Sequence, residues 1–326
     1  MMRRQHTWAI VLAAGNGTRL ASLTRDAHGA TVPKQFCALV SGQALLGDAL
    51  ARAARITSRE RICVVVAERH RHYWEPSLRS LVPANLLVEP RNCGTALGIL
   101  HAVTHIVKQD PGAHIVVLPA DHYFKDEARF SRHLARTVSL LRADRRKVVI
   151  VGAEPDGTDC DLGYVVPGPA QPDGGHAVVR FVEKPEPEAV RELLAAGAVC
   201  NTLILAAEGA VLLTLLCGRM SGIASSMWIA LARRVQHERA SAALRAIYAR
   251  LPVVDFSQTV LQGNEAHLRL LTVPSCGWSD LGTPARPLRA LATMDNVSDS
   301  ARKRRRVNVP GVLSLATHCQ SLQMGP

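Results

Sequence analysis

The chain has 326 residues, of which 48% are apolar, and a formal net charge of +12 at pH 7. This length and apolar content exclude a small domain that depends on disulfides, and the eight cysteines form no CxxC pair, so we expect a cytoplasmic protein. No apolar run approaches the roughly 20 residues that span a bilayer, so we expect no membrane partner. The net positive charge favours anionic partners, of which phosphorylated substrates are one class and nucleic acids another.

Short apolar runs alternate with amphipathic stretches through the first half of the chain. The runs IVLAA, ICVVVA, HIVVLPA and VVIVGA begin at Ile10, Ile62, His114 and Val148, and amphipathic patterns cover residues 45–56 and 96–108. Apolar strands that are buried on both faces and joined by helices are typical of a parallel sheet. Further along, we predict strands over 163–166 and 177–182 and helices over 187–196, 209–216 and 227–251. The whole pattern predicts a single α/β domain over residues 1–297, with a mixed, mostly parallel central sheet and helices on both faces.

Residues 298–326 differ in composition from the rest of the chain. They include the run RKRRR at 302–306, which has no interleaved aromatic side chain on which a base could stack. We therefore predict a basic, poorly ordered tail and expect no nucleic-acid partner. Binding of nucleic acid through this run is the alternative, and a steep salt dependence would reveal it.

A glycine-containing segment follows the first apolar run. In IVLAAGNGTRL, Gly15 and Gly17 let the backbone approach a phosphate chain closely because neither carries a Cβ. The Rossmann fingerprint needs a third glycine where this chain has Leu20, and a Walker loop needs a lysine directly after its last glycine. Both are missing here. With Arg19 in the loop and Lys34 downstream as a second cation, the segment predicts a triphosphate cradle of another kind.

An aspartate stands directly after the third apolar run. Asp121 follows HIVVLPA, and in open α/β sheets the ligand lies beyond the carboxyl ends of the strands. We therefore expect Asp121 to face a nucleotide, with a helix cap or a turn as the alternative.

Several motifs together resemble those of one enzyme family. The segments LAAGNGTRL, PKQF, VEPRNCGTALGI, LPADHYF, GYV, FVEKP and GWSDLGT are similar to those of the sugar-1-phosphate nucleotidyltransferases, and most similar to those of the mannose-1-phosphate guanylyltransferases. The resemblance extends from about Trp8 to about Leu288. It implies a single Rossmann-like, GT-A-like catalytic domain. It also implies transfer of a nucleotidyl group from a nucleoside triphosphate to a sugar 1-phosphate, with release of pyrophosphate, Mg²⁺ as cofactor and a capacity to form homo-oligomers.

The resemblance also implies a role for each matching residue. Catalytic roles fall to Arg19, Lys34, Asp121 and Lys184, and the Mg²⁺ ligands are Asp121 and Asp280. The nucleotide would be bound by Leu12, Ala13, Ala14, Gly15, Gly17, Thr18, Glu89, Asn92, Gly94 and Thr95. The sugar phosphate would be bound by Gly163, Glu183, Lys184 and Asn201, and Asp255 would start a helix near the sugar.

Glu89 gives a physical reason to expect GTP. The Watson–Crick edge of guanine offers two adjacent N–H donors, and an ionised carboxylate is purely an acceptor. Uracil and thymine offer one donor between two acceptors, which an amide would serve better. The hypothesis is therefore a guanylyltransferase that uses mannose 1-phosphate, with uridylyl, thymidylyl and cytidylyl transfer left open. A local ion pair between Glu89 and Arg91 is the alternative.

The chain departs from the family pattern on the sugar side. The family usually has an aromatic residue followed by Asn-Ser-Gly, whereas this chain has Cys200, Asn201, Thr202 and Leu203. Replacement of a flexible glycine by Leu203 is expected to narrow or reshape the sugar pocket. A non-catalytic relative that binds a nucleotide or a nucleotide-sugar is therefore the second hypothesis.

Overall fold

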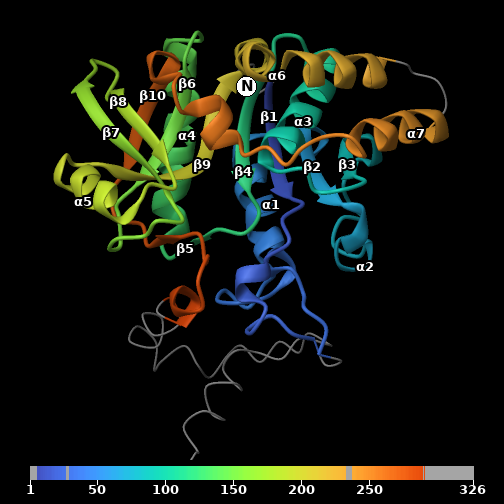
Figure 1. Cartoon of the computed structure of the whole chain (residues 1–326), viewed down its shortest axis with the longest axis horizontal. Helices are drawn as coiled ribbons and strands as arrows, with labels where there is room; N and C mark the ends of the chain where they lie inside the picture. The colour runs from blue at the N-terminus through green and yellow to red at the C-terminus, as the bar shows by residue number, and fades with distance from the viewer. Residues whose placement is uncertain (1–5, 27–28, 233–236, 289, 291–326) are drawn as a thin grey trace, which may run out of the picture.

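The computed structural model of the protein describes residues 6–26, 29–232, 237–288 and 290 (Figure 1). Its strands are β1 (Thr7–Ala13), β2 (Ile62–Ala67), β3 (Leu86–Glu89), β4 (His114–Pro119), β5 (Tyr123–Phe124), β6 (Val148–Ala153), β7 (Gly163–Ala170), β8 (His176–Glu183), β9 (Val199–Glu208), β10 (Leu268–Val273) and β11 (Trp278–Ser279). Its α-helices are α1 (Leu45–Ile56), α2 (Arg71–Trp74), α3 (Thr95–Gln109), α4 (Glu127–Ala143), α5 (Pro187–Ala195), α6 (Gly209–Ala232) and α7 (His237–Tyr248). The predicted tail, residues 298–326, lies outside the described residues.

The described strands build one large mixed sheet in the order β3-β2-β1-β4-β9-β6-β10-β8-β7. Strands β3, β2, β1 and β4 are parallel, as are β6 and β10. The strand β9 is antiparallel to β4, β6 and β7, and β8 is antiparallel to β10 and β7. The prediction of a mixed sheet is confirmed, but that of a mostly parallel one is not. The reason is that β7 and β8 form a hairpin rather than a crossover, and β9 returns to the middle of the sheet.

Helices cover both faces of the sheet, as the sequence predicts. On β1, Trp8 and Ile10 belong to a core cluster shared with α3 and α6, whereas Ala9 and Val11 belong to a second cluster shared with α1 and α4. Successive strand residues point to opposite faces, so a continuous apolar run fills both clusters at once. This burial explains why the run at Ile10 contains no polar residue.

The helix α6 departs from the expectations in two ways. It continues well beyond the predicted end at 216, with non-helical backbone angles at Met220 (φ −139°, ψ 44°). Over Gly209–Leu231 its mean hydropathy is 1.4, so by length and composition alone this segment could cross a membrane. The prediction that no apolar run approaches the length needed to span a bilayer was therefore wrong. Along it, Leu212, Leu216 and Met227 are buried against the core cluster that α3 also lines.

The sheet register brings the candidate loops together. Leu12 near the end of β1 pairs with Pro119 at the end of β4, so the glycine loop and Asp121 leave the same edge of the sheet. The short strand β11 then pairs antiparallel with β5, with Ser279 opposite Tyr123. Because Asp280 follows Ser279 and Asp121 precedes Tyr123 by two residues, this pairing carries the two aspartates to one place.

Phe130 should be a stability determinant of this edge. It is fully buried in α4 and stacks on Phe124 of β5 with ring centroids 3.7 Å apart. We expect Phe130→Ala to lower the free energy of unfolding by about 3 to 5 kcal/mol, because it leaves a cavity behind the short sheet. Urea unfolding measures the loss. The control Val179→Ala, at a side chain that is 63% exposed, should change it by less than about 0.5 kcal/mol.

Candidate functional site

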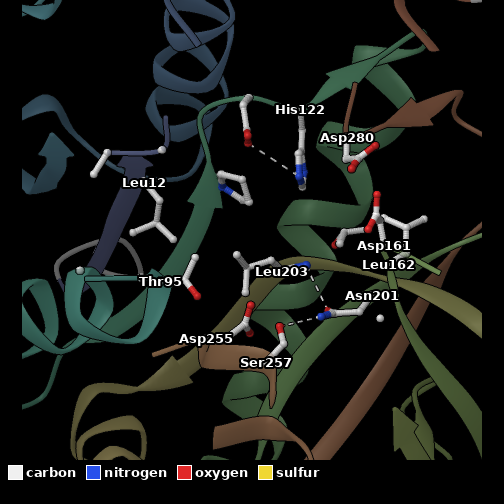
Figure 2. A pocket seen from close by; sticks show the side chains of 18 of the residues that line it. Leu12, Thr95, His122, Asp161, Leu162, Asn201, Leu203, Asp255, Ser257 and Asp280 are labelled. Carbon is white, nitrogen blue, oxygen red and sulfur yellow. Dashed lines mark hydrogen bonds and ion pairs between the residues drawn. The ribbon is translucent and has the colours of Figure 1, made fainter. Parts of the chain in front are cut away.

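A cavity of about 360 Å³ opens at the carboxyl ends of the parallel strands (Figure 2). Most of the residues singled out from the sequence line it. They are Leu12, Ala14, Gly15, Arg19, Lys34, Glu89, Asn92, Gly94, Thr95, Asp121, Gly163, Glu183, Lys184, Asn201 and Asp280. Segments that lie far apart in the chain therefore converge on one site, which is large enough for part of a nucleotide.

Three residues of the predicted nucleotide loop lie elsewhere. Gly17 and Thr18 line a smaller adjoining cavity of about 170 Å³ together with Lys34. Gly17 has a φ of 63°, and a Cβ there would lie 2.7 Å from the backbone nitrogen of Lys34, so glycine is required for close approach of the two segments. Ala13 is buried, and its carbonyl oxygen accepts a hydrogen bond of 2.9 Å from the amide of Gln35. Its side chain belongs to the core cluster shared with α1 and α4, and Ala13 lines neither cavity.

Lys34 joins the two aspartates. Its ammonium lies 3.0 Å from Oδ2 of Asp121 and donates a 2.6 Å hydrogen bond to the backbone oxygen of Asp280. Burial by itself would raise the pKa of Asp121, but Lys34 and, more weakly, His122 lower it below its usual value. Burial lowers the pKa of His122 to about 4, so that ring is neutral at pH 7. Asp121 is therefore held as a carboxylate beside a buried cation.

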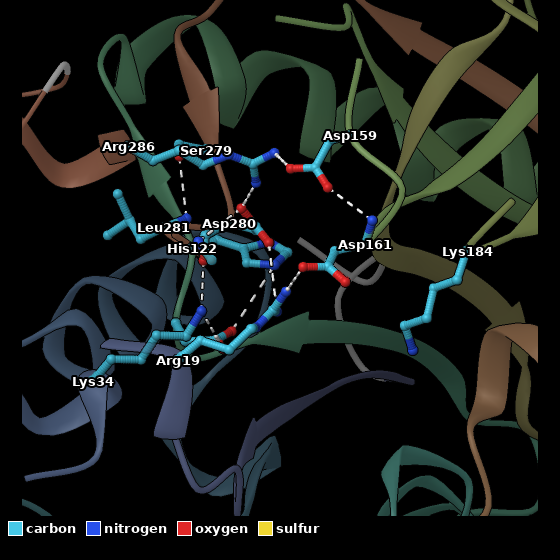
Figure 3. Close-up of polar contacts among 12 residues, drawn as sticks. Arg19, Lys34, His122, Asp159, Asp161, Lys184, Ser279, Asp280, Leu281 and Arg286 are labelled. Carbon is cyan, nitrogen blue, oxygen red and sulfur yellow. Dashed lines mark hydrogen bonds and ion pairs between the residues drawn. The ribbon is translucent and has the colours of Figure 1, made fainter. Parts of the chain in front are cut away.

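A chain of alternating charges continues from Asp280 (Figure 3). Arg286 contacts Oδ1 of Asp280 with one guanidinium nitrogen and Asp159 with the other. Arg19 donates a 3.0 Å hydrogen bond to Asp161 and lies 4.0 Å from Oδ2 of Asp280. Each carboxylate thus faces a cation from a distant part of the chain.

The two predicted metal ligands suit a divalent cation only if substrate oxygens complete the site. Among the described residues there is no group of three or more His, Cys, Asp or Glu side chains that could hold a metal ion. Lys34 contacts Oδ2 of Asp121 and Arg286 contacts Oδ1 of Asp280, so the other oxygen of each carboxylate is the one that could coordinate. Two carboxylates together with phosphate oxygens and waters are the usual surroundings of Mg²⁺. The residues present therefore fit this cation in the presence of a phosphorylated ligand.

Glu89 lies at the deep end of the cavity. Glu89 is the last residue of β3, and its Oε1 accepts a 2.9 Å hydrogen bond from the hydroxyl of Tyr248. Burial raises the pKa of Glu89 to about 7, and the bond from Tyr248 opposes this rise. Arg91 does not pair with Glu89 as the alternative hypothesis proposed. It donates instead to the backbone oxygens of Tyr248 and Leu251.

A second acidic cluster occupies the opposite end. The ammonium of Lys184 lies 3.0 Å from Oδ2 of Asp255 and 3.7 Å from Oε1 of Glu183. Burial raises the pKa of Glu183 to about 7, Asp255 raises it further, and Lys184 lowers it. A Cβ on Gly163 would lie 2.2 Å from Oε2 of Glu183, so the space at Gly163 accommodates this carboxylate. That oxygen is buried without a hydrogen-bond partner, which leaves it able to accept one from a ligand.

Several residues near the site were not predicted from the sequence. Asp159 and Asp161 belong to the acidic run DGTDCDLGY before β7, which is a signal that could have been used. Gln35 is adjacent to Lys34 and could also have been considered. The contacts of Tyr248 with Glu89 and of Arg286 with Asp159 have no local signal, because only the folded chain brings together residues that are 159 and 127 positions apart.

A family model described as "Nucleotidyl transferase" matches residues 8–295 of the chain. The chain belongs to this nucleotidyl transferase family. The family resemblance expected from the motifs is thereby confirmed.

Individual proteins are also similar to this chain. The Xanthan biosynthesis protein XanB of Xanthomonas campestris is 35% identical over 190 residues, which are 58% of this chain and 39% of that protein. The mannose-1-phosphate guanylyltransferase of Escherichia coli is 31% identical over 193 residues, which are 58% of this chain and 40% of that protein. The chain thus matches about two fifths of the length of these relatives.

Solved structures share the fold of this nucleotidyl transferase. One described as mannose-1-phosphate geranyltransferase from Thermus thermophilus gives a TM-score of 0.70 at 29% identity, over 85% of this chain and 76% of that chain. A structure described as a putative glucose-1-phosphate thymidylyltransferase from Bacillus anthracis gives a TM-score of 0.55 at 15% identity, over 90% of this chain and 96% of that chain. At that low identity the second likeness shows the fold alone.

Arg286 should stabilise the acidic side of the cavity. The side chains of Asp280 and Arg286 are only 11% and 17% exposed, so Arg286→Met leaves a carboxylate without its cation in a largely dry place. We expect urea unfolding in the presence of a chelator to show a loss of about 2 kcal/mol.

The double variant Asp280→Asn with Arg286→Met should lose less than the sum of the two single changes. Arg191→Met is the matched control, because Arg191 pairs with Glu188 on the surface and should contribute under about 0.5 kcal/mol. Additive losses for Asp280 and Arg286 would contradict their coupling.

Proposed function

We propose that this protein transfers a guanylyl group from GTP to mannose 1-phosphate, forming GDP-mannose and pyrophosphate. The observation that carries the proposal is that three groups of side chains line one cavity: the cluster of Lys34, Asp121 and Asp280, the buried carboxylate of Glu89 and the Glu183–Lys184 pair. Membership of the nucleotidyl transferase family and the names of its relatives support this reading.

The reaction needs no protein nucleophile. A phosphate oxygen of the sugar 1-phosphate attacks the α-phosphorus of GTP in line, and the bond to the β-phosphate oxygen breaks to release pyrophosphate. Negative charge is redistributed over the phosphate oxygens, so catalysis depends on positioning and on cations. Arg19 and Lys34 would bind the triphosphate, assisted by the backbone of the glycine loop, and Lys184 would orient the incoming phosphate.

Asp121 and Asp280 would hold Mg²⁺, which when bound would neutralise charge on the phosphates. The role of Lys34 follows from its burial. An ammonium that already lies 3.0 Å from Asp121 needs little rearrangement to contact a phosphate placed next to that carboxylate. Such preorganisation lowers the cost of gathering charge at the reacting atoms.

The same proposal includes the cellular setting. The printed names of relatives refer to xanthan and alginate biosynthesis, which supports a supply of nucleotide-sugar for polysaccharide biosynthesis. We propose a cytoplasmic reaction, because both substrates of the proposed reaction are charged, water-soluble metabolites.

Loss of Lys34 or Asp121 should remove most of the activity. We expect Lys34→Ala and Asp121→Ala to lower the rate of pyrophosphate release by about 10² to 10³, the effect of removing one electrostatic stabiliser. The assay crosses GTP, UTP, dTTP and CTP with mannose, glucose and N-acetylglucosamine 1-phosphates in the presence of Mg²⁺. Lys125→Ala, a change at an exposed lysine, is the matched control and should leave the rate unchanged.

Retained turnover in the Asp121 variant would contradict its assignment. If the unaltered protein bound GTP but released no pyrophosphate across the whole grid, it would be a non-catalytic nucleotide binder instead. Release with UTP, dTTP or CTP in preference to GTP would overturn the choice of base alone.

Guanine recognition by Glu89 should depend on pH. The carboxylate form accepts both N–H donors of guanine, and with a pKa of about 7 this form becomes dominant only as the pH rises above 7. We therefore expect the dissociation constant for GTP to fall between pH 6 and pH 8. Glu89→Gln should flatten this dependence and weaken binding by roughly tenfold to a hundredfold at pH 8.

Calorimetric titration with GTP measures both effects. ITP lacks one of the two guanine donors and serves as the control ligand, whose binding should respond less to the Glu89 variant. An unchanged pH dependence in Glu89→Gln would show that another group causes it.

A further inference from the structure

One leucine in the site has a backbone conformation that leucine rarely adopts. Leu203 on β9 has a φ of 54°, in the left-handed region where a Cβ is crowded by the backbone. A conformation of this kind persists only where the surrounding structure imposes it, and it often marks a functional position.

The surroundings of Leu203 explain how it is held there. The pairing of β9 with β6 is irregular at this point, because Gly152 pairs with Asn201 and Ile150 pairs with Leu205. Three residues of β9 therefore lie opposite a single residue of β6. Irregularities of this type bend a strand and redirect a side chain.

The side chain of Asn201 fixes this bend. Its Oδ1 accepts a 3.0 Å hydrogen bond from the backbone N–H of Leu203, and its Nδ2 donates a 3.0 Å bond to Oγ of Ser257 (Figure 2). Both ends of the amide are therefore used within the protein. Asn201 therefore holds Leu203 in place, in addition to the role in binding the sugar phosphate that the resemblance implies.

The bend places Leu203 at the junction of the two ends of the cavity. Leu203 lines the cavity and, in Figure 2, lies between Thr95 and Asn201, with Asp255 close by. Thr95 belongs to the predicted nucleotide end, whereas Asn201 and Asp255 belong to the sugar end. In the proposed reaction the atoms at this junction are the phosphate and the sugar carbon that bears it, C1. C1 is bonded in the ring to C2 and to the ring oxygen, and of these two atoms only C2 carries a substituent that could meet the apolar wall formed by Leu203.

We propose that Leu203 determines the sugar specificity of this protein by excluding hexose 1-phosphates that carry an acetamido group at C2. This inference rests on the proposed function. It narrows the substrate class to hexose 1-phosphates with a hydroxyl at C2. An acetamido group has four heavy atoms, two of them polar, where a hydroxyl has one, and Leu203 fills the space that the larger group would need.

Two variants separate the volume of Leu203 from its backbone strain. Leu203→Ala removes side-chain volume but keeps a Cβ at a positive φ, whereas Leu203→Gly removes both. The measured quantity is the ratio of kcat/KM for N-acetylglucosamine and N-acetylmannosamine 1-phosphates to kcat/KM for mannose 1-phosphate, each with GTP and Mg²⁺. We expect this ratio to rise by about tenfold or more in both variants, because both remove the side-chain volume of Leu203.

Thermal unfolding provides a second readout. Leu203→Gly should have a Tm at least as high as that of Leu203→Ala, because glycine adopts a positive φ without crowding. Leu213→Ala is the matched control: Leu213 is partly buried against the same core cluster, does not line the cavity and should leave the sugar ratio unchanged.

The outcomes are distinguishable. An unchanged ratio in both active variants would overturn the role of Leu203 and leave the proposed function standing, as would efficient use of an acetamido sugar by the unaltered protein. Absence of pyrophosphate release from the unaltered protein with every sugar phosphate would overturn the proposed function, and this inference with it.

Discussion

The rest of the site depends on the contacts that Lys34 makes. Its buried ammonium connects the end of β4, through Asp121, with the segment after β11, through the backbone of Asp280. The glycine loop is tied to the same place, because Gly17 packs directly on the backbone of Lys34 and Gln35 holds the loop carbonyls of Ala13 and Gly15. A single short segment therefore sets the relative positions of three regions that are distant in the sequence.

Electrostatics divide the cavity into regions of different character. Around Lys34 and Arg286, cations of the chain neutralise Asp121 and Asp280 and keep the pKa of Asp121 low. At Glu89 and Glu183, burial dominates and raises the pKa of both carboxyl groups to about 7. Carboxyl groups thus acquire different pKa values from their surroundings. The surroundings of Asp121 and Asp280 suit phosphates and a hard cation, and those of Glu89 and Glu183 suit ligand groups that donate hydrogen bonds.

The irregular strand β9 contributes to the same site. It is inserted antiparallel between β4 and β6, and together with the β7–β8 hairpin it makes the sheet mixed. The same strand carries Asn201 and Leu203 to the cavity at the irregular pairing with β6. A regular parallel strand in this position would present alternate side chains to the two faces of the sheet and would not turn a leucine toward the ligand.

The sequence by itself determined the elements and most of the residues that meet in the cavity. Apolar runs and amphipathic periods are local signals, so β1, β2, β4, β6, α1 and α3 were predicted close to their observed bounds. Asp121 could be singled out because it directly follows an apolar run, and Lys34 and Glu89 because they stand in motifs that resemble those of one enzyme family. The tertiary structure alone decided the direction of β9, the hydrogen bond of Asn201 to Ser257 and the ion pair of Arg286 with Asp159. These depend on which distant segments come together, and that choice is made by the packing of the whole chain, which no local pattern contains.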